Sequence, residues 1–443
     1  MGRKEDRKAA KKEKIAAAEF CKVQNKYVPE LFELFEATAD PRNPYYITYS
    51  NRMMLGQMYF KGVAGITSMQ GMTQAFNNKA VSKNLSILMG CPKRKYLPHH
   101  VTENEYLERL NPEELEKVIH EMVYGLIRRR TFEDARYKKR WLIIVDGTQT
   151  YSGDRKINEN CLERHYEKGT EKEHVNYHLD VLEAKIYLGE NLVCSIGSEF
   201  IENSEECRRN YREMSEEEFK QDCETKAFRR LAEKIKKRYP RLPILLLGDS
   251  LYASEPVMKI CKAYGWDYLV RFKDGSIPSI AEEYRSLPDK ERSGRAEFVN
   301  GIEYKGHSVN VLRYKEKKEE KGEWKEREFQ WITSLRITVR NAEKMAGTGR
   351  QRWKIENEGF NRQKNWQGDI THACSFNANA LKNHYLIYQI ADFVRQMYEH
   401  FSLEKKGIKW TKKNISSALL ASFGGQLTGE DISKKRLEKP AFN

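Results

Sequence analysis

Carboxylates at the ends of apolar runs are the side chains in this sequence best placed to do chemistry. Asp146 directly follows the apolar run 141–145, and Asp249 follows a second run, 242–248. Such runs are typical of buried strands, and the carboxyl ends of buried strands are where open α/β sheets bind their ligands. Glu356 lies further along, in a stretch of helical character. We expect the three acids to meet at one edge of a sheet.

The chemistry open to three neighbouring carboxylates is that of a divalent metal ion. Three anionic groups held together repel one another unless a hard cation neutralises them, and Mg²⁺ or Mn²⁺ suits an all-oxygen ligand set. Two such ions roughly 4 Å apart can activate a water or a 3′-hydroxyl and stabilise the leaving oxygen of a phosphodiester. Any one of these acids alone would be an ordinary surface carboxylate. Further acids near strand ends could add a ligand, but each is expected to be structural or exposed: Asp154, Asp180, Glu199 and Glu202.

The contexts of the three acids resemble known motifs. The segments 143–148, 246–253 and 352–361 are similar to the three acidic motifs of DDE transposases of the insertion-sequence IS4-like group, and the resemblance spans roughly residues 50–400. In that group the third motif carries Tyr, two residues, Arg, three residues, the catalytic Glu, six residues and Lys. Arg352 stands at the Arg position of this pattern.

Two positions of the third motif depart from the pattern of the group. Gly349 stands at the Tyr position, and Gln363 stands at the Lys position, with Lys364 one residue later. At about 100° per residue along an α-helix, Gln363 lies about 20° from the direction of Glu356 and Lys364 about 80° from it. The helical phase therefore does not assign a role to Lys364.

Glu358 competes with Glu356 for the third acidic position. Arg352 lies four residues before Glu356, on the same helical face, but six residues before Glu358, which turns the arginine away. Trp353 and Phe360, seven residues apart, are expected to form the apolar stripe that seats this helix on the sheet. The sequence favours Glu356.

The resemblance implies a cut-and-paste transposase, which binds the terminal inverted repeats of its own element, cleaves DNA in a metal-dependent reaction and transfers the freed strand to target DNA. It implies that Asp146, Asp249 and Glu356 are catalytic and hold two Mg²⁺ (or Mn²⁺) ions. It also implies double-stranded DNA as the partner and a homodimer in a synaptic complex. Two alternatives stay open: a standalone metal-dependent nuclease, and a domesticated DNA-binding protein that does not cleave.

Basic side chains near the three acids are candidate DNA contacts. Arg271, Lys273, Arg350 and Arg352 lie at or just after the ends of expected elements that face the same sheet edge, and Lys364 lies beside the Lys position of the third motif. Guanidinium and ammonium groups there would hold the phosphate backbone. The whole chain has 79 basic and 64 acidic residues, a net charge of +15 and a pI near 9.2, which also favours a polyanionic partner.

Composition and cysteine spacing narrow the class of protein. The 443 residues, 39% of them hydrophobic, are enough for two or three domains with a real core. The eight cysteines include no Cys-x-x-Cys pair, so neither a zinc ribbon nor a dense disulfide framework is expected, and a reducing cytoplasm is the simplest compartment. No apolar run approaches 18 residues, so no membrane span is expected, and the charged first residues do not resemble a signal peptide. Together with the resemblance, this predicts a cytoplasmic, nucleoid-associated protein of a bacterium or archaeon.

The pattern of apolar residues predicts an α/β protein with a mixed sheet flanked by helices. The chain is helical in character up to about residue 136, and alternating or apolar runs then predict strands at 141–145, 177–188, 192–201, 242–248 and 268–272. Helices are expected at 216–239, 255–264 and 385–398. The assignment of an RNase H-like fold follows from the resemblance, because the pattern alone supports only the α/β class.

These elements predict five consecutive parts. They are an N-terminal helical domain expected to bind DNA ends (1–137), the first part of the catalytic core (138–290), a β-rich insertion (291–333), the last part of the core (334–400) and a basic C-terminal tail (401–443). A charged hairpin tip is expected at 315–325 within the insertion. In IS4-like transposases an aromatic side chain of the insertion can assist a DNA hairpin intermediate. Trp324 and Trp331 are candidates by type, although Trp331 alternates like a core residue.

Overall fold

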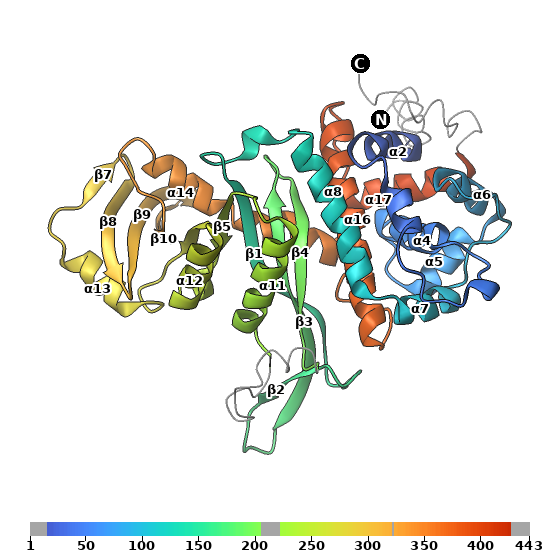
Figure 1. The fold of residues 1–443 in the computed structure, drawn as a ribbon, viewed down its shortest axis with the longest axis horizontal. Coiled ribbons are helices and arrows are strands. Elements are labelled where there is room, and N and C mark those ends of the chain that lie inside the picture. The colour runs from blue at the N-terminus through green and yellow to red at the C-terminus, as the bar shows by residue number, and fades with distance from the viewer. Residues whose placement is uncertain (1–15, 205–221, 321–322, 427–443) are drawn as a thin grey trace.

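The structure, a computed structural model, describes residues 16–204, 222–320 and 323–426. Figure 1 shows three regions in a row: a helical region drawn largely from the N-terminal part of the chain, a central sheet with helices against it, and further strands with helices at the other end. The basic N-terminal run and the first residues of the helix predicted at 216–239 lie outside the described residues.

One mixed sheet runs through the central and the outer region. Within the described residues its strands follow the order β2-β3-β1-β5-β6-β10-β9-β8-β7, and β4 pairs with β3 beside this path. β1 is parallel to β5 and β5 is parallel to β6, whereas β1 and β3 are antiparallel. The strands are β1 (Trp141–Gly153), β2 (Leu162–Tyr166), β3 (His174–Tyr187), β4 (Val193–Ile201), β5 (Ile244–Gly248), β6 (Asp267–Arg271), β7 (Glu291–Ser293), β8 (Ala296–Tyr304), β9 (His307–Glu320) and β10 (Glu323–Thr333). This confirms the predicted α/β class with a mixed sheet flanked by helices, and it is consistent with an RNase H-like core.

The pairing of the parallel strands β1 and β5 ends just before Asp146 and Asp249, although β1 itself continues beside β3 to Gly153, beyond the end of the strand predicted at 141–145. The first five residues of β1 and all five of β5 are buried, as expected for apolar strands covered on both faces. Trp141 pairs with Ile244, so Asp146 and Asp249, each five residues later, leave the core at the same level of the sheet.

Helices cover both faces of the central sheet. Neighbouring residues of a strand, such as Glu183 and Ala184 of β3, face opposite sides of the sheet. Glu183 accepts a hydrogen bond from Tyr385 of α16 (Ala378–Tyr398) at 2.9 Å. Gly197 of β4, the partner of Ala184, lies instead against Leu231 of α11 (Glu224–Arg238). The sheet is therefore held between α11 on one face and α16 on the other.

The N-terminal helical region confirms the helical character predicted there. It consists of α2 (Ala16–Tyr27), α3 (Leu31–Glu36), η1 (Pro44–Tyr46), α4 (Asn51–Val63), α5 (Met69–Phe76), α6 (Lys79–Leu88), α7 (His100–Arg109), α8 (Pro112–Arg128) and η2 (Glu133–Ala135). α8 begins as its sequence predicts, because the Asn111 side chain accepts the backbone N–H of Glu113 and Pro112 occupies the first helical position.

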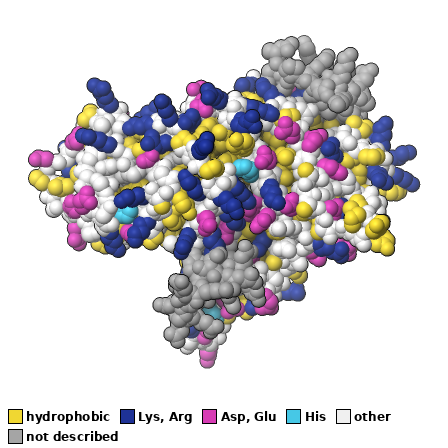
Figure 2. Space-filling view, in the orientation of Figure 1, with side chains coloured by type: hydrophobic (Ala, Val, Ile, Leu, Met, Phe, Trp, Pro, Cys, Tyr) yellow, Lys and Arg dark blue, Asp and Glu magenta, His cyan; other side chains and the backbone are white. Residues whose placement is uncertain are grey.

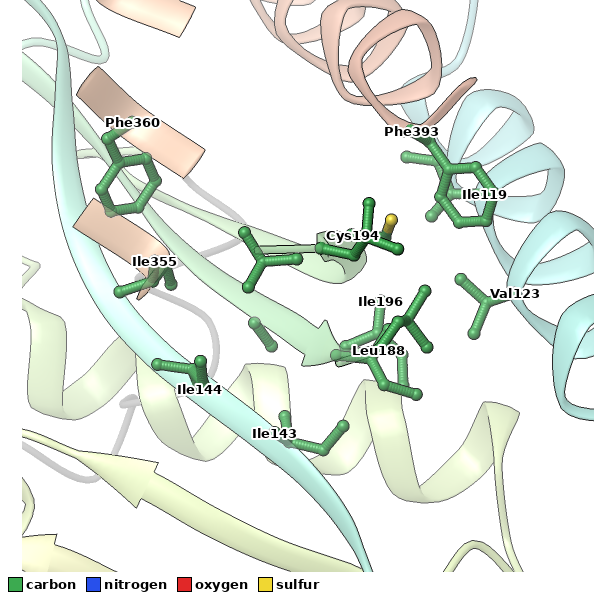
Figure 3. Packing of buried hydrophobic residues seen from close by; sticks show 14 of the residues in the cluster. Ile119, Val123, Ile143, Ile144, Leu188, Cys194, Ile196, Ile355, Phe360 and Phe393 are labelled. Carbon is green, nitrogen blue, oxygen red and sulfur yellow. The ribbon is translucent and has the colours of Figure 1, made fainter. Parts of the chain in front are cut away.

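α8 and α16 join the helical region to the sheet. α16 contacts α2, α4, α7 and α8 on one side and β4 on the other. Figure 3 shows Ile119 and Val123 of α8 and Phe393 of α16 beside Cys194 and Ile196 of β4. Nearly every residue of α16 after its second turn is buried, because the helix lies between two layers rather than on a surface.

The segment predicted as a C-terminal tail is helical and packed over its described part. It contains η5 (Glu399–Glu404), α17 (Lys412–Ala421) and η6 (Ser422–Gln426). Ile415, Leu419 and Phe423 recur every four residues and are all buried, and Phe423 packs edge to face on Phe60 of α4 with ring centres 5.3 Å apart. This apolar stripe explains why residues 412–423 dock on the N-terminal helices instead of forming a tail.

The predicted β-rich insertion is present but continues the core sheet. β10 pairs with β9 along its length and with β6 of the core at Trp331, Ile332 and Thr333. The hairpin tip predicted at 315–325 is shorter than expected, because the β9–β10 ladder extends as far as the pair Glu320 and Glu323. The helices that lie between β5 and α16 along the chain are η3 (Ser250–Tyr252), α12 (Glu255–Tyr264), α13 (Pro278–Ser286), α14 (Ala342–Arg350), η4 (Ile355–Phe360) and α15 (Asn361–Asn365).

Candidate active site

Asp146 is the electrostatic centre of the candidate site. Arg352 Nη1 donates a hydrogen bond to Asp146 Oδ2 at 3.1 Å, and the backbone N–H of Gly147 donates to Asp146 Oδ1 at 3.1 Å. Burial raises the pKa of the Asp146 carboxyl to about 6; Arg352 opposes this rise, and the charges of Asp249 and Glu356 add to it. Asp249 and Glu356 are therefore close enough to act on Asp146, as the sequence predicted.

Asp249 is held by the turn that follows β5. Its Oδ1 accepts the backbone N–H of Leu251 at 2.8 Å, so the side chain caps the short helix η3. The side chain of Asp249 is half-buried at the sheet edge. The cap leaves the other carboxylate oxygen for a further partner.

Glu356 lies in a π-helical segment rather than in a regular α-helix. The segment η4 connects α14 and α15 through a turn at residues 351 and 352. Single turns of π-helix inside α-helices occur frequently at functional sites. The angles expected from the sequence hold only for an α-helix, so they do not apply to this segment. Gln363, expected about 20° from the direction of Glu356, is fully buried against Gln389 and Asp392.

The apolar stripe expected for this helix was partly wrong. Trp353 is 51% exposed and does not seat the helix. Ile355 and Phe360, both fully buried, do so instead, and Figure 3 shows them next to β1, near Ile144. The π-helical turn brings these two residues, five apart, onto one face of the segment.

Glu358 is directed toward a different partner from Glu356. Its charge raises the pKa of Arg362, together with the nearer Glu399 and Asp392. Glu356 is the acid of this segment whose charge adds to the rise in the pKa of Asp146. The choice of Glu356 over Glu358 as the catalytic acid stays a prediction.

The three acids fit a hard divalent ion in charge and ligand type, although they form an open arrangement. Within the described part of the chain, a different group has its potential ligand atoms all within 4.8 Å of one another: Glu190, His400 and Glu404. This group lies at the surface, and His400 already pairs with both carboxylates. The three candidate acids carry three negative charges against the single guanidinium of Arg352, and oxygen donors with excess negative charge are the ligands that Mg²⁺ and Mn²⁺ prefer.

Arginine side chains gather beside the acids. Burial lowers the pKa of Arg271, and the nearby positive charge of Arg352 lowers it further. The Arg271 guanidinium lies over the Phe329 ring at 4.9 Å, and that of Arg350 lies over the same ring at 4.9 Å. Arg350 is also paired with Glu316 at 2.7 Å. Two of the predicted DNA contacts, Arg271 and Arg350, thus lie over one aromatic ring, and Arg271 is also close to a third, Arg352.

The remaining predicted DNA contacts are less closely tied to the acids. Lys273 is exposed just beyond the end of β6. Lys364 is half-buried, and its ammonium group lies 5.8 Å from the centre of the Phe360 ring. The structure gives neither residue a bond to the three acids within the described residues.

The additional acids considered from the sequence separate into two groups. Glu199 pairs with Arg230, Glu202 pairs with Lys382, and Asp154 is exposed, so these are structural or solvated as expected. Asp180 lies closer to the site, since its charge acts on Glu224 of α11. Its Oδ2 is 3.0 Å from His178 Nδ1.

Glu224 is a further acid of the site that the sequence did not single out. Burial raises the pKa of the Glu224 carboxyl, a hydrogen bond from Tyr252 opposes the rise, and the charges of Asp146 and Asp249 add to it. Acidic residues are common in the first turn of a helix, so the residue type carried no special signal. Its neighbours in space, Gly147 and Tyr252, are far from it along the chain.

Part of the chain is similar to a known protein family. Residues 220–388 match a family model described as a transposase DDE domain. This range includes Asp249 and Glu356 and begins after Asp146. No curated protein matches the chain. The match supports a DDE transposase, an enzyme that acts on DNA. In the part of the chain that the structure describes, no helix has the length and apolar character needed to cross a membrane.

Proposed function

We propose that this chain is a cut-and-paste transposase of the IS4-like group, which binds the terminal inverted repeats of its element, cleaves the DNA there and joins the freed 3′-hydroxyl to target DNA. One observation carries the proposal: Asp146 and Asp249 leave the core at the same level of two parallel strands, and Glu356 acts on Asp146 from a third segment. The transposase DDE domain match supports it independently.

Asp146, Asp249 and Glu356 are the proposed catalytic residues and would hold two Mg²⁺ or Mn²⁺ ions. Ions of this kind, when bound, supply Lewis-acid chemistry to a water or 3′-hydroxyl and to the leaving oxygen of a phosphodiester. The partly buried setting of Asp146 strengthens its attraction for a cation, because charge is poorly solvated there. Arg352 now neutralises Asp146, and with an ion in place its guanidinium would be released to orient the scissile phosphate.

The DNA backbone would run along the edge occupied by the arginines. Arg271, Arg350 and Arg352 lie close together, and positive charges gathered beside one another favour a polyanionic partner. Lys273 and Lys364 would extend this contact on either side. Figure 2 shows Lys and Arg side chains spread over the visible face, so a long duplex would find basic groups beyond this edge.

The N-terminal part, 1–137, is the proposed DNA-end-binding domain. Tyr45 is 92% exposed and Tyr46 84% exposed on η1, a turn fixed by Pro44 and by the side chain of Asn43, which accepts the N–H of Tyr45. Arg94 ties the neighbouring loop to this turn by donating to the backbone oxygen of Thr48 at 3.2 Å. Aromatic rings presented beside basic groups suit contact with bases and phosphates.

Trp324 is the better candidate for an aromatic side chain that assists a hairpin step. It is 71% exposed on the β9–β10 hairpin, whereas Trp331 is 2% exposed and stacks on Phe329 with ring centres 6.0 Å apart. The packing role expected for Trp331 from its alternation is confirmed. We propose in addition that the chain acts as a homodimer in a synaptic complex, in the cytoplasm of a bacterium or archaeon and in contact with the nucleoid.

A strand-transfer assay tests this function against its two alternatives. Inverted repeats found on either side of the gene would supply the ends, and a duplex carrying a pre-cut 3′-hydroxyl end would be incubated with plasmid and Mg²⁺. A transposase joins the end to the plasmid. Cleavage of intact ends without joining would indicate a standalone nuclease, and binding of the ends with neither reaction would indicate a domesticated DNA-binding protein.

A further inference from the structure

Glu224 reaches the backbone beside Asp146. The residue begins α11, which packs on β3 and β4, and its carboxylate lies over Gly147 of β1. A Cβ added at Gly147 would stand 2.9 Å from Glu224 Oε2. Because Gly147 has no side chain, the carboxylate occupies the space next to the residue that follows Asp146.

Tyr252 fixes the other oxygen of Glu224. The Tyr252 hydroxyl donates to Glu224 Oε1 at 2.6 Å, and the tyrosine is itself 2% exposed, with Phe228 packed edge to face on its ring. Tyr252 is the last residue of η3, the turn that Asp249 caps. A single buried hydroxyl therefore connects Glu224 to the segment of Asp249 while Oε2 faces the segment of Asp146.

The charge around Glu224 is not balanced by the protein. Within the described residues no Lys or Arg forms an ion pair with Glu224, Asp249 or Glu356, and Arg352 pairs with Asp146 alone. Four carboxylates therefore share one guanidinium in a partly buried place. Such an excess is unfavourable unless cations are bound, and four carboxylates would balance the charge of two divalent ions.

We propose that Glu224 is a fourth carboxylate ligand of the metal centre that Asp146, Asp249 and Glu356 would form, and that Tyr252 is the positioning residue that holds it there. The inference rests on the proposed function, since it adds a ligand to the same centre. It divides the ligands between both faces of the sheet, with Glu224 arriving from α11 and Glu356 from η4.

Metal binding without DNA tests the assignment directly. Mn²⁺ would be titrated into the full chain by calorimetry for the wild type, Glu224→Gln, Tyr252→Phe and Asp146→Asn, with Glu233→Gln as the matched control, an exposed glutamate on the same helix. Glu224→Gln keeps the acceptor for Tyr252 and removes only the charge. We expect it to weaken Mn²⁺ binding by about tenfold or more, Tyr252→Phe to weaken it less, and Glu233→Gln to bind as the wild type does.

The melting temperature in EDTA separates a ligand from a structural residue. Loss of a repelling charge should leave the metal-free Glu224→Gln variant at least as stable as the wild type. If Glu224→Gln and Tyr252→Phe both bound Mn²⁺ with wild-type affinity, the inference would be overturned. If Asp146→Asn lost Mn²⁺ binding in the same experiment, the proposed function would remain intact. Absence of Mn²⁺ binding by the wild type would remove the metal centre itself, and the proposed function with it.

Discussion

Asp146 shows how burial and neighbouring charge prepare a carboxylate for a cation. Its pKa of about 6 reflects a desolvated anion near two other acids, with Arg352 as partial compensation. In the metal-free protein this arrangement is a cost to folding. A bound ion would remove that cost, so stability and metal binding are linked at this residue.

The first prediction concerns the pH dependence of stability without metal. The pKa of Asp146 in the folded state, about 6, lies above its ordinary value of 3.8. Between pH 3.8 and pH 6, therefore, the folded state keeps a proton on Asp146 that the unfolded state has lost. The free energy of unfolding should therefore fall as the pH rises through this window. Asp146→Asn should remove this part of the dependence and stabilise the EDTA-treated protein at pH 7 by up to about 3 kcal/mol.

Urea denaturation of the wild type and Asp146→Asn at pH 4.5 and pH 7, in EDTA, measures this difference. Asp154→Asn, a change at an exposed aspartate just after β1, is the control and should behave as the wild type. Equal pH dependence in the wild type and Asp146→Asn would show that Asp146 is ionised and well compensated without metal.

At the residue scale the sequence located Asp146 and Asp249 because each directly follows an apolar run, although β1 continues past Asp146 to Gly153. The charge of Glu356 does act on Asp146, but Glu356 was preferred over Glu358 from an α-helical phase that the π-helical turn does not follow, so that choice stays a prediction. Glu224 could not be found in this way. Its position depends on Gly147 and Tyr252, which meet it only in the folded chain.

At the scale of elements, a buried polar network fastens the segment of Glu356 to α16. Arg362 donates to Glu399 at 3.0 Å through each of two guanidinium nitrogens and lies 3.0 Å from Asp392. Gln363 donates to Asp392 at 2.8 Å. Gln389 accepts from Lys185 of β3 at 2.7 Å, so the network reaches the sheet. These bonds fix the register between η4, α15 and α16 where apolar packing alone would not.

The second prediction follows from this network. Arg362→Ala would leave Asp392 and Glu399 buried with less compensation, and removal of one partner of a buried ion pair typically costs about 3–5 kcal/mol. Thermal and urea unfolding of the variant should show a loss of this size. Arg340→Ala, at an exposed arginine, is the control and should change stability little. A loss below about 1 kcal/mol for Arg362→Ala would show that the network is not needed for stability.

The third prediction separates the two tryptophans of the outer strands. Trp331→Ala should destabilise the protein by about 3–5 kcal/mol, because the buried indole packs against Phe329 and Gly349. Trp324→Ala should leave the melting temperature unchanged, since its side chain is 71% exposed. If a hairpin intermediate forms, Trp324→Ala should reduce its yield on a denaturing gel. An unchanged yield would exclude Trp324 from that step.

Element patterns gave the strands and helices of the core well, because buried strands and amphipathic helices each have a clear period. The joining of β10 to β6 was not predictable, since strand pairing between distant segments has no local signal. The packing of 412–423 on the N-terminal helices was missed for a related reason. Basic residues nearby suggested a tail, while the stripe of Ile415, Leu419 and Phe423 is short.

At the scale of the whole molecule, the helical region lies at one end, and the sheet edge that carries the acids and arginines lies in the centre. The chain as a whole has an excess of basic residues. Figure 1 places α4, α5 and α7 away from β1 and β5, the strands at which Asp146 and Asp249 lie. A duplex that reached both would cross much of the molecule. Recognition of the DNA end and cleavage would then be functions of separate surfaces.

The fourth prediction tests this separation. Replacement of both Tyr45 and Tyr46 by Ala should weaken binding of an end duplex by about thirtyfold or more, because ring contacts with bases contribute on the order of 1–3 kcal/mol each. The melting temperature should not change, since both side chains are exposed. Fluorescence anisotropy measures the affinity, and Tyr124→Ala, at an exposed tyrosine of α8, is the control. Unchanged affinity in the double variant would place the end-binding surface elsewhere.

The most direct test of the account is strand cleavage of a duplex carrying the ends of the element, in Mg²⁺ and in EDTA, by the wild type, Glu356→Gln and Glu358→Gln. The two variants make the same chemical change two residues apart, and the charge of Glu356 acts on Asp146 whereas that of Glu358 acts on Arg362. We predict Mg²⁺-dependent cleavage that falls by about a thousandfold or more in Glu356→Gln and remains within about tenfold of the wild type in Glu358→Gln. Full activity of Glu356→Gln, or cleavage in EDTA, would contradict the assignment of the metal centre.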